Sequence, residues 1–134
     1  MDKEQQELMF KLQIFEQQIR QLQEQIEAVE NGLVQMSSLD LGLDELVGSK
    51  DKEILAPMGR GIFVKAKVLS EDLTVDVGGK NFVKKTIPET KKIIQKQIKK
   101  LEEVKKELDD NLEKLGEELT KVYSEAQGKS EGKG

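Results

Sequence analysis

The sequence predicts an α+β fold, a long antiparallel two-helix coiled coil with two β-hairpins inserted between its helices. Apolar residues recur every three or four positions in the first and last parts of the chain, whereas the middle alternates apolar and polar residues. The expected segments are a first coiled-coil helix over 1–37, a short helix and linker over 38–52, two hairpins over 53–86, a second coiled-coil helix over 87–127 and a disordered tail over 128–134.

The first helix is indicated by an unbroken 4-3 repeat of apolar residues over four heptads. A stripe only two residues in seven wide is typical of a coiled-coil seam rather than of a helix on a globular core. The seam members are Leu8, Leu12, Phe15, Ile19, Leu22, Ile26, Val29, Leu33 and Met36. The segment after them fits one or two helical turns, with Ser38 as N-cap and Gly48 just past the end, and its leucines are expected to fold back on the sheet.

Two hairpins are indicated between Glu53 and Thr86. The expected strands are Ile54 to Met58, Ile62 to Val68, Leu73 to Val77 and Phe82 to Lys85, with glycine-containing turns after the first and the third. Ile62, Val64, Ala66 and Val68 share one face of their strand, opposite Phe63, Lys65 and Lys67. So small a sheet has open edges and an apolar face to cover, so something else is expected to complete it.

The second helix is expected to start at Thr86, with Thr86 as N-cap, Pro88 in the first turn and Glu89 as the capping-box acid. Its seam is expected at Ile94, Ile98, Leu101, Leu108, Leu112, Leu115, Leu119 and Val122, with a phase slip at Val104/Lys105. Both seams span four heptads, so the helices are expected to pair antiparallel with positions that add to about 130. Leu8 is then expected near Val122, and Met36 near Ile94.

Lysines are concentrated in one stretch: nine Lys against three Glu lie between Lys84 and Lys106. One interpretation is a basic helix that binds nucleic acid or a membrane. The favoured interpretation is cross-helix pairing with Glu24, Glu27 and Glu30, because the net charge of −4 argues against a general nucleic-acid binder. The pairing leaves Lys91 and Lys92, which oppose the helix dipole, without an explanation.

Composition excludes most catalytic classes. The chain has no Cys and no His, so thiol nucleophiles, imidazole bases and thiolate zinc sites are absent, and the protein is not expected to be an enzyme or to hold a cofactor or metal. The glycines near Lys80 do not match a phosphate-binding loop. No stretch approaches a membrane span and no basic leader precedes an apolar run, so a soluble, cytoplasmic protein without membrane contact is expected.

Apolar residues beside the seam mark the ends of the two helices farthest from the strands. Met9 and Phe10 follow Leu8, while Tyr123 and Ala126 extend the apolar surface around Val122. Because a two-helix coil covers only its own stripe, these side chains are expected to be partly exposed and to mark a binding site. The alternative is ordinary helix-end fraying with scattered apolar residues.

The order helix, two hairpins, helix, with ILAPMGRGIFVKAKV opening the insert, resembles prefoldin, and two hairpins rather than one resemble its alpha-class subunit. Arg60 departs from the small residue expected in this motif. The resemblance implies a hexamer of two alpha and four prefoldin beta subunits in which the strands complete a β-barrel platform. It also implies an ATP-independent chaperone, a holdase that captures unfolded client proteins at the coil tips and delivers them to a group II chaperonin.

Two sets of residues are predicted to carry this function. The client-binding set is Leu8, Met9, Phe10, Leu12, Leu119, Val122 and Tyr123, and the oligomer-assembly set is Ile62, Val64, Ala66, Val68, Leu73, Val75, Val77 and Phe82. Client capture is expected to rest on weak apolar contacts multiplied by several coils around one cavity. The alternative function is a coiled-coil scaffold or adaptor with one dedicated partner and no general chaperone activity.

Overall fold

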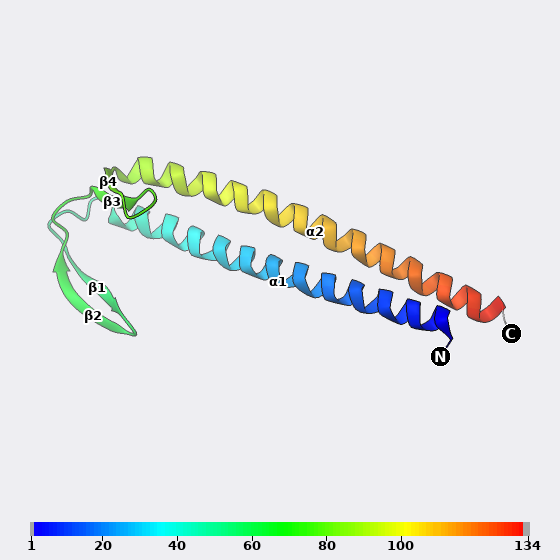
Figure 1. Ribbon diagram of the computed structural model, residues 1–134. Coiled ribbons are helices and arrows are strands. Elements are labelled where there is room, and N and C mark those ends of the chain that lie inside the picture. The colour runs from blue at the N-terminus through cyan, green and yellow to red at the C-terminus, as the bar shows by residue number, and fades with distance from the viewer. Residues whose placement is uncertain (1, 133–134) are drawn as a thin grey trace. The chain divides into compact units, whose positions relative to one another are not determined.

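The computed structural model describes the backbone of residues 2–132 and the side chains of residues 2–126, and it divides into two units. The helical unit comprises residues 2–32 and 101–132, and the mixed unit is Leu33–Lys100. The elements in chain order are α1 (Lys3–Leu46), β1 (Glu53–Gly59), β2 (Ile62–Lys67), β3 (Leu73–Asp76), β4 (Phe82–Lys85) and α2 (Ile87–Gly132) (Figure 1). The predicted order of helix, two hairpins and helix is confirmed.

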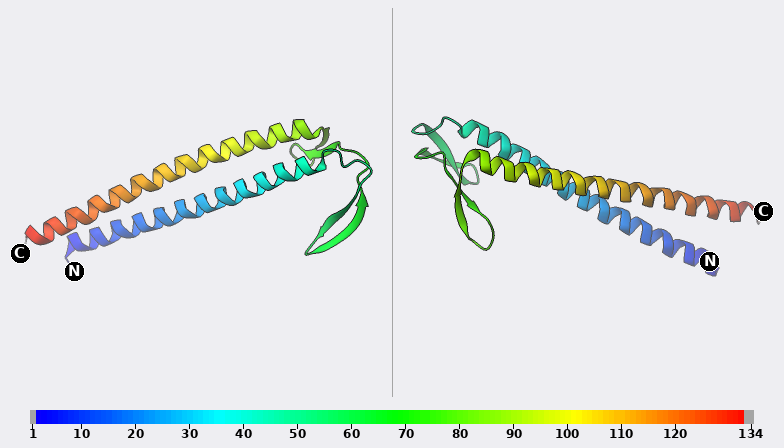
Figure 2. Two further views of the ribbon diagram at one scale, coloured as in Figure 1. Left: turned by 180° about the vertical axis from the view of Figure 1, so that it is seen from behind. Right: turned by 90° about the horizontal axis from the view of Figure 1, so that it is seen from above.

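In the helical unit, the segments of α1 and α2 run antiparallel beside each other (Figures 1 and 2). Every predicted α1 seam residue from Leu8 to Val29 is half-buried, whereas its neighbours in sequence are exposed. A Cβ added to Gly32 would lie 3.5 Å from Leu101 Cδ1, and Nζ of Lys105 lies 3.5 Å from a carboxylate oxygen of Glu30. The helices therefore pair antiparallel as predicted. The residue numbers of facing positions add to a few more than the predicted value of about 130.

The seam of α2 contains no phase slip. Its 4-3 spacing continues from Leu101 through Lys105 to Leu108, and Lys105 is half-buried while Val104 is 43% exposed. The predicted slip at Val104/Lys105 is therefore wrong, because the regular geometry of the two helices places a lysine on the seam. The lysine stem can cover apolar neighbours while its ammonium group reaches the edge and Glu30.

Both helices are longer than the sequence predicts. α1 runs through Ser37 and Ser38 without a break, so Ser38 is not an N-cap and the segment over 38–46 is not a separate helix. Leu43 and Leu46 continue the buried stripe of α1, and their burial outweighs the capping preference of serine. Gly48, with φ 77°, follows the end of α1 as expected. α2 continues past 127 to Gly132, and residues 133–134 of the predicted tail lie outside the described residues.

The two hairpins are separate two-stranded antiparallel sheets. In the first, Ile54 pairs with Ala66 and Ala56 with Val64, and the register shifts between Pro57 and Gly59. Its turn residues Arg60 and Gly61 have φ of 51° and 79°, the positive values that a two-residue turn matching the strand twist requires. In the second, Val75 pairs with Val83, and the Asp76 carboxylate accepts a hydrogen bond from the amide of Gly78 at 2.8 Å within the turn.

A small core holds the mixed unit together. Leu43 of α1 and Ile87 and Ile94 of α2 are buried, and Met36, Leu46, Leu73 and Ile98 pack against them. Met36 and Ile94 therefore belong to one cluster, as predicted, and Leu43 and Leu46 share that cluster with Leu73 of β3, whereas Leu41 stays exposed. Thr86 caps α2, because its hydroxyl accepts a hydrogen bond from the amide of Glu89 at 3.2 Å.

Candidate functional site

The candidate client site lies where α1 begins and α2 approaches its end, within the helical unit. Met9 directly follows the seam residue Leu8, and Tyr123 directly follows the seam residue Val122. Leu8 and Val122 occupy the same heptad position in their helices. In an antiparallel helix pair, the residues that directly follow such positions lie on the same side of the seam. Met9 and Tyr123 are accordingly exposed, the tyrosine at 47%, and Phe10 at 64% lies farther around α1.

The seven predicted client-binding residues fall into two groups. Met9, Phe10 and Tyr123 present their side chains to solvent. Leu8, Leu12, Leu119 and Val122 are half-buried seam residues whose apolar surface is largely used to hold the two helices together. The accessible part of the set is therefore smaller than the sequence predicts.

Sequence reasoning missed one exposed apolar residue in this region. Ile14, exposed at 39%, lies one turn beyond Phe10 on the same face of α1. Ile14 falls outside the 4-3 repeat, and the sequence signal for it is its spacing of four residues from Phe10. Met9, Phe10, Ile14 and Tyr123 are hereafter called the tip cluster.

The candidate assembly surface is the pair of hairpins in the mixed unit. Of the predicted assembly set, Ile62, Val64, Val77 and Phe82 are exposed, and Ala66, Val68, Leu73 and Val75 are half-buried. Leu73 differs in role from the rest, because it packs on the core of its own chain. Both hairpins expose large apolar side chains that a soluble monomer does not usually display so densely.

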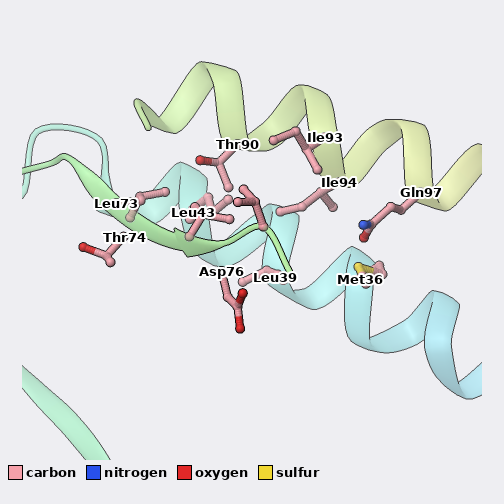
Figure 3. A pocket seen from close by; sticks show the side chains of 12 residues that line it. Met36, Leu39, Leu43, Leu73, Thr74, Asp76, Thr90, Ile93, Ile94 and Gln97 are labelled. Carbon is pink, nitrogen blue, oxygen red and sulfur yellow. The ribbon is translucent and has the colours of Figure 1, made fainter. Parts of the chain in front are cut away.

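A groove of about 650 Å³ lies where β3 crosses the two helices of the mixed unit (Figure 3). Its apolar wall is formed by Met36, Leu39 and Leu43 of α1, Leu73 and Val75 of β3, and Ile93 and Ile94 of α2. Thr74 and Asp76 of β3 point away from the helices in this view. The groove carries no charged side chain besides Asp76, so it is suited to apolar contact rather than to catalysis.

Lys91 forms the main charged contact of the mixed unit. Its ammonium group donates a hydrogen bond to a carboxylate oxygen of Asp44 and lies 3.8 Å from Oδ1 of Asp40. The hydrogen bond to Asp44 raises the pKa of Lys91, partial desolvation opposes this effect, and the negative charge of Asp40 adds to it. These contacts explain why a lysine stands near the start of α2, where the helix dipole disfavours it.

The cross-helix charge pairing predicted for the lysine-rich stretch holds for Glu30 alone. Lys105 pairs with Glu30, whereas Glu24 and Glu27 make no ion pair among the described residues. Over residues 2–132, neither helix has a stretch apolar and long enough to cross a membrane. Among the side chains that the structure describes, Asp and Glu form no group of three suited to hold a metal ion.

Comparison with known proteins gives a consistent result. A family model described as "Prefoldin subunit" matches residues 8–132. "Prefoldin subunit alpha" of Methanobrevibacter smithii is 30% identical over 110 residues, covering 81% of this chain and 70% of that protein. "Prefoldin subunit alpha" of Methanococcus aeolicus is 34% identical over 104 residues, covering 76% of this chain and 70% of that protein.

The fold is also found among solved structures. A chain in the cryo-EM structure of filamentous PFD from Methanocaldococcus jannaschii matches with a TM-score of 0.75 and 22% sequence identity. The match covers 85% of this chain and 96% of that chain. At this identity the likeness concerns the fold, two long helices with two small antiparallel hairpins between them.

Proposed function

Because the chain belongs to the prefoldin subunit family and is similar to its alpha-class members, we propose that it is a subunit of an ATP-independent holdase. In this proposal, the tip cluster captures unfolded proteins, and the assembled complex passes them to a group II chaperonin in the cytoplasm. The hairpins join the chain to prefoldin beta subunits, two alpha to four beta. The observation that carries the proposal is the exposure of Met9, Phe10, Ile14 and Tyr123 at the end of a helix pair whose seam does not cover them.

The chemistry of the tip cluster suits a client without defined structure. Methionine and aromatic side chains offer large, adaptable apolar contacts, and methionine in particular fits irregular surfaces. Each tip presents only four such side chains, so a single contact with a client is weak. Several coils in one complex would hold the same unfolded chain at several points, and the effective concentration then multiplies the weak affinities.

Assembly is supported by the surface of the hairpins. Each two-stranded sheet leaves two strand edges unpaired, and it exposes Ile62, Val64, Val77 and Phe82 to solvent. Pairing of these edges with strands of other subunits would satisfy the backbone groups and cover one apolar face of each hairpin, as closure of a barrel does. Native mass spectrometry of the chain with and without a prefoldin beta subunit tests this part of the proposal.

The decisive experiment for client capture is suppression of aggregation, followed by light scattering of chemically denatured clients of unrelated sequence. The assembled complex is prepared with wild-type chain or with Met9, Phe10, Ile14 and Tyr123 changed to Ser. The variant is expected to assemble normally and to need about tenfold more complex for equal suppression, given that several weak apolar contacts are lost together.

The matched control is Val104→Ser, which removes an exposed apolar side chain from the same unit outside the tip cluster. It is expected to suppress aggregation like wild type. Full suppression by the tip variant would remove the site assignment. Failure of the wild-type complex to protect any unrelated client would favour the dedicated scaffold instead.

A further inference from the structure

The outward side of α1 in the mixed unit differs in composition from the rest of the chain. More than a third of all residues are charged, yet between Asn31 and Leu43 Asp40 alone carries a charge, and Asp40 lies on the seam side near Lys91. The outward residues of this stretch are all exposed and uncharged. They are Val34, Gln35, Ser38, Leu41 and Gly42, and this set is called the α1 face.

The α1 face combines exposed apolar side chains with a glycine that leaves the helix backbone uncovered. Leu41 is 67% exposed and Val34 is 65% exposed, one heptad apart on the same side of the helix. Gly42 stands in the interior of the helix, where glycine is unfavourable relative to alanine. A Cβ at Gly42 would have no neighbour within 4 Å, so the packing of this chain does not require a glycine there. Without a Cβ at Gly42, the helix backbone is open to close approach by a partner from outside the chain.

The first hairpin supplies a surface of matching chemistry. Its pairing places Ile54, Ala56, Val64 and Ala66 on one face, and Leu55, Pro57, Phe63 and Lys65 on the other, which is called the hairpin outer face. Closing a barrel covers only one face of a hairpin. The hairpin outer face keeps Leu55 at 63% and Phe63 at 57% exposure, so it has apolar surface left for a second contact.

We propose that the α1 face is the docking surface for the hairpin outer face of a second copy of this chain. The inference rests on the part of the proposed function in which hairpins assemble subunits, and it adds a helical acceptor that strand pairing does not provide. The dimensions agree: Val34 to Leu41 spans about 10 Å of helix at 1.5 Å per residue, and three strand residues span about 7 to 10 Å. Phe63 on Leu41 and Gly42 forms the centre of the contact.

Charge complementarity sets the direction of the docked hairpin. The last turn of α1 carries no basic residue, so its carbonyl ends and Glu45 present negative charge, while Asp44 is engaged by Lys91. The hairpin has Arg60 at its tip, a few residues beyond Phe63. A hairpin with Phe63 over Leu41 and its tip toward the end of α1 brings Arg60 of one copy to Glu45 of the other.

The absence of native cysteine allows a direct test by disulfide formation. Chains with Ser38→Cys and chains with Lys65→Cys are mixed under oxidising conditions, and cross-linked dimer is quantified on a non-reducing gel. The proposal expects this pair to cross-link at least tenfold faster than Ser38→Cys mixed with Val64→Cys, because Val64 lies on the opposite face of the hairpin. Equal rates would overturn the proposal. The proposal would also be overturned if the double variant Ser38→Cys/Lys65→Cys formed its disulfide only within one chain and not between two chains.

Association without any client is measured by sedimentation velocity. Gly42→Leu and Leu41→Ser are each expected to weaken self-association at least tenfold, and Gly116→Ala, another helix glycine with open space around it, is expected to leave it unchanged. Glu45→Lys should weaken association, and adding Arg60→Glu should restore it. A chain that stays monomeric, or cross-links that form only after a beta subunit is added, would show that a second copy is not the occupant.

These outcomes are separable from the proposed function. If the α1-face variants leave self-association unchanged while Val64→Lys or Phe82→Lys abolishes assembly, the result would support assembly through the hairpins and rule out the α1 face as a docking surface. Loss of aggregation suppression by the tip variant alone concerns client capture and does not bear on docking.

Discussion

Nζ of Lys91 lies 3.8 Å from Oδ1 of Asp40, so a charged pair occupies facing positions on the seam between α1 and α2 in the mixed unit. Asp40 follows Met36 by four residues and precedes Leu43 by three, and Lys91 precedes Ile94 by three. Asp44, one turn after Asp40, accepts a hydrogen bond from the same lysine. The end of α1 and the start of α2 are thereby linked beside the core of the mixed unit.

Removing one partner of this pair is expected to destabilise the mixed unit. Lys91→Met leaves the half-buried carboxylate of Asp40 without its cation, and we expect the melting temperature by circular dichroism to fall by a few degrees. The double variant Asp40→Leu/Lys91→Leu is expected to recover that loss or exceed wild type, since apolar side chains suit the seam. A double variant less stable than Lys91→Met would contradict this account.

The pH dependence follows from the raised pKa of Lys91. The ordinary value is 10.5, so the pair contributes its full stability below that pH and loses it as the pH rises through the higher pKa of the folded state. The stability difference between wild type and Lys91→Met is therefore expected to shrink above pH 10.5. Urea unfolding from pH 8 to 12 measures it, with Lys91→Arg as the control that keeps its charge. A difference that is constant over this range would argue against the ion pair.

Gly116→Ala is expected to stabilise α2 by up to about 1 kcal/mol, because glycine in a helix interior loses more backbone freedom than alanine. An added Cβ at this position meets no atom within 4 Å, so no clash offsets the gain. Urea unfolding followed by circular dichroism gives the free energy. Loss of stability would mean that Gly116 is needed for a conformation other than the one described.

Lys105→Leu is expected to raise the stability of the helical unit by about 1 kcal/mol, the order gained when a polar seam residue is replaced by an apolar one. Glu30→Gln should change it by less than about 1 kcal/mol, because the ion pair is partly exposed. Thermal unfolding compares the two variants with Val104→Leu, which lies off the seam. If Val104→Leu stabilised the protein more than Lys105→Leu, Val104 rather than Lys105 would lie on the seam, as the phase slip predicted from the sequence requires.

Prediction from sequence succeeded where one pattern dominated. The 4-3 repeat located the seam residues of α1 from Leu8 to Met36, and alternation together with the glycine-containing turns located the four strands, because these patterns follow directly from helix and strand geometry. It failed at Ser38 and Lys105, where a residue's own preference disagreed with the regular continuation of a helix. In each place the continuing geometry prevailed, since leaving it would expose Leu43 or break the seam.

Partners across the chain were harder to predict. The role of Lys91 depends on Asp40 and Asp44, which the expected helix break at Ser38 had placed in a separate element. The tip cluster was mostly visible as apolar residues beside the seam, but the half-burial of Leu8, Leu12, Leu119 and Val122 depends on how closely the helices approach each other.

The contacts that join α1 to α2 also determine the order in which the chain can fold. Lys91 and Asp44 are 47 residues apart in sequence, and the pairs of the helical unit are farther apart still, whereas each hairpin closes within a few residues. Local pairings form early and distant ones late. During synthesis, α1 therefore emerges with its apolar stripe uncovered and stays so until α2 has been made. For that interval the nascent chain has the same exposed apolar surface as the unfolded proteins it is proposed to bind.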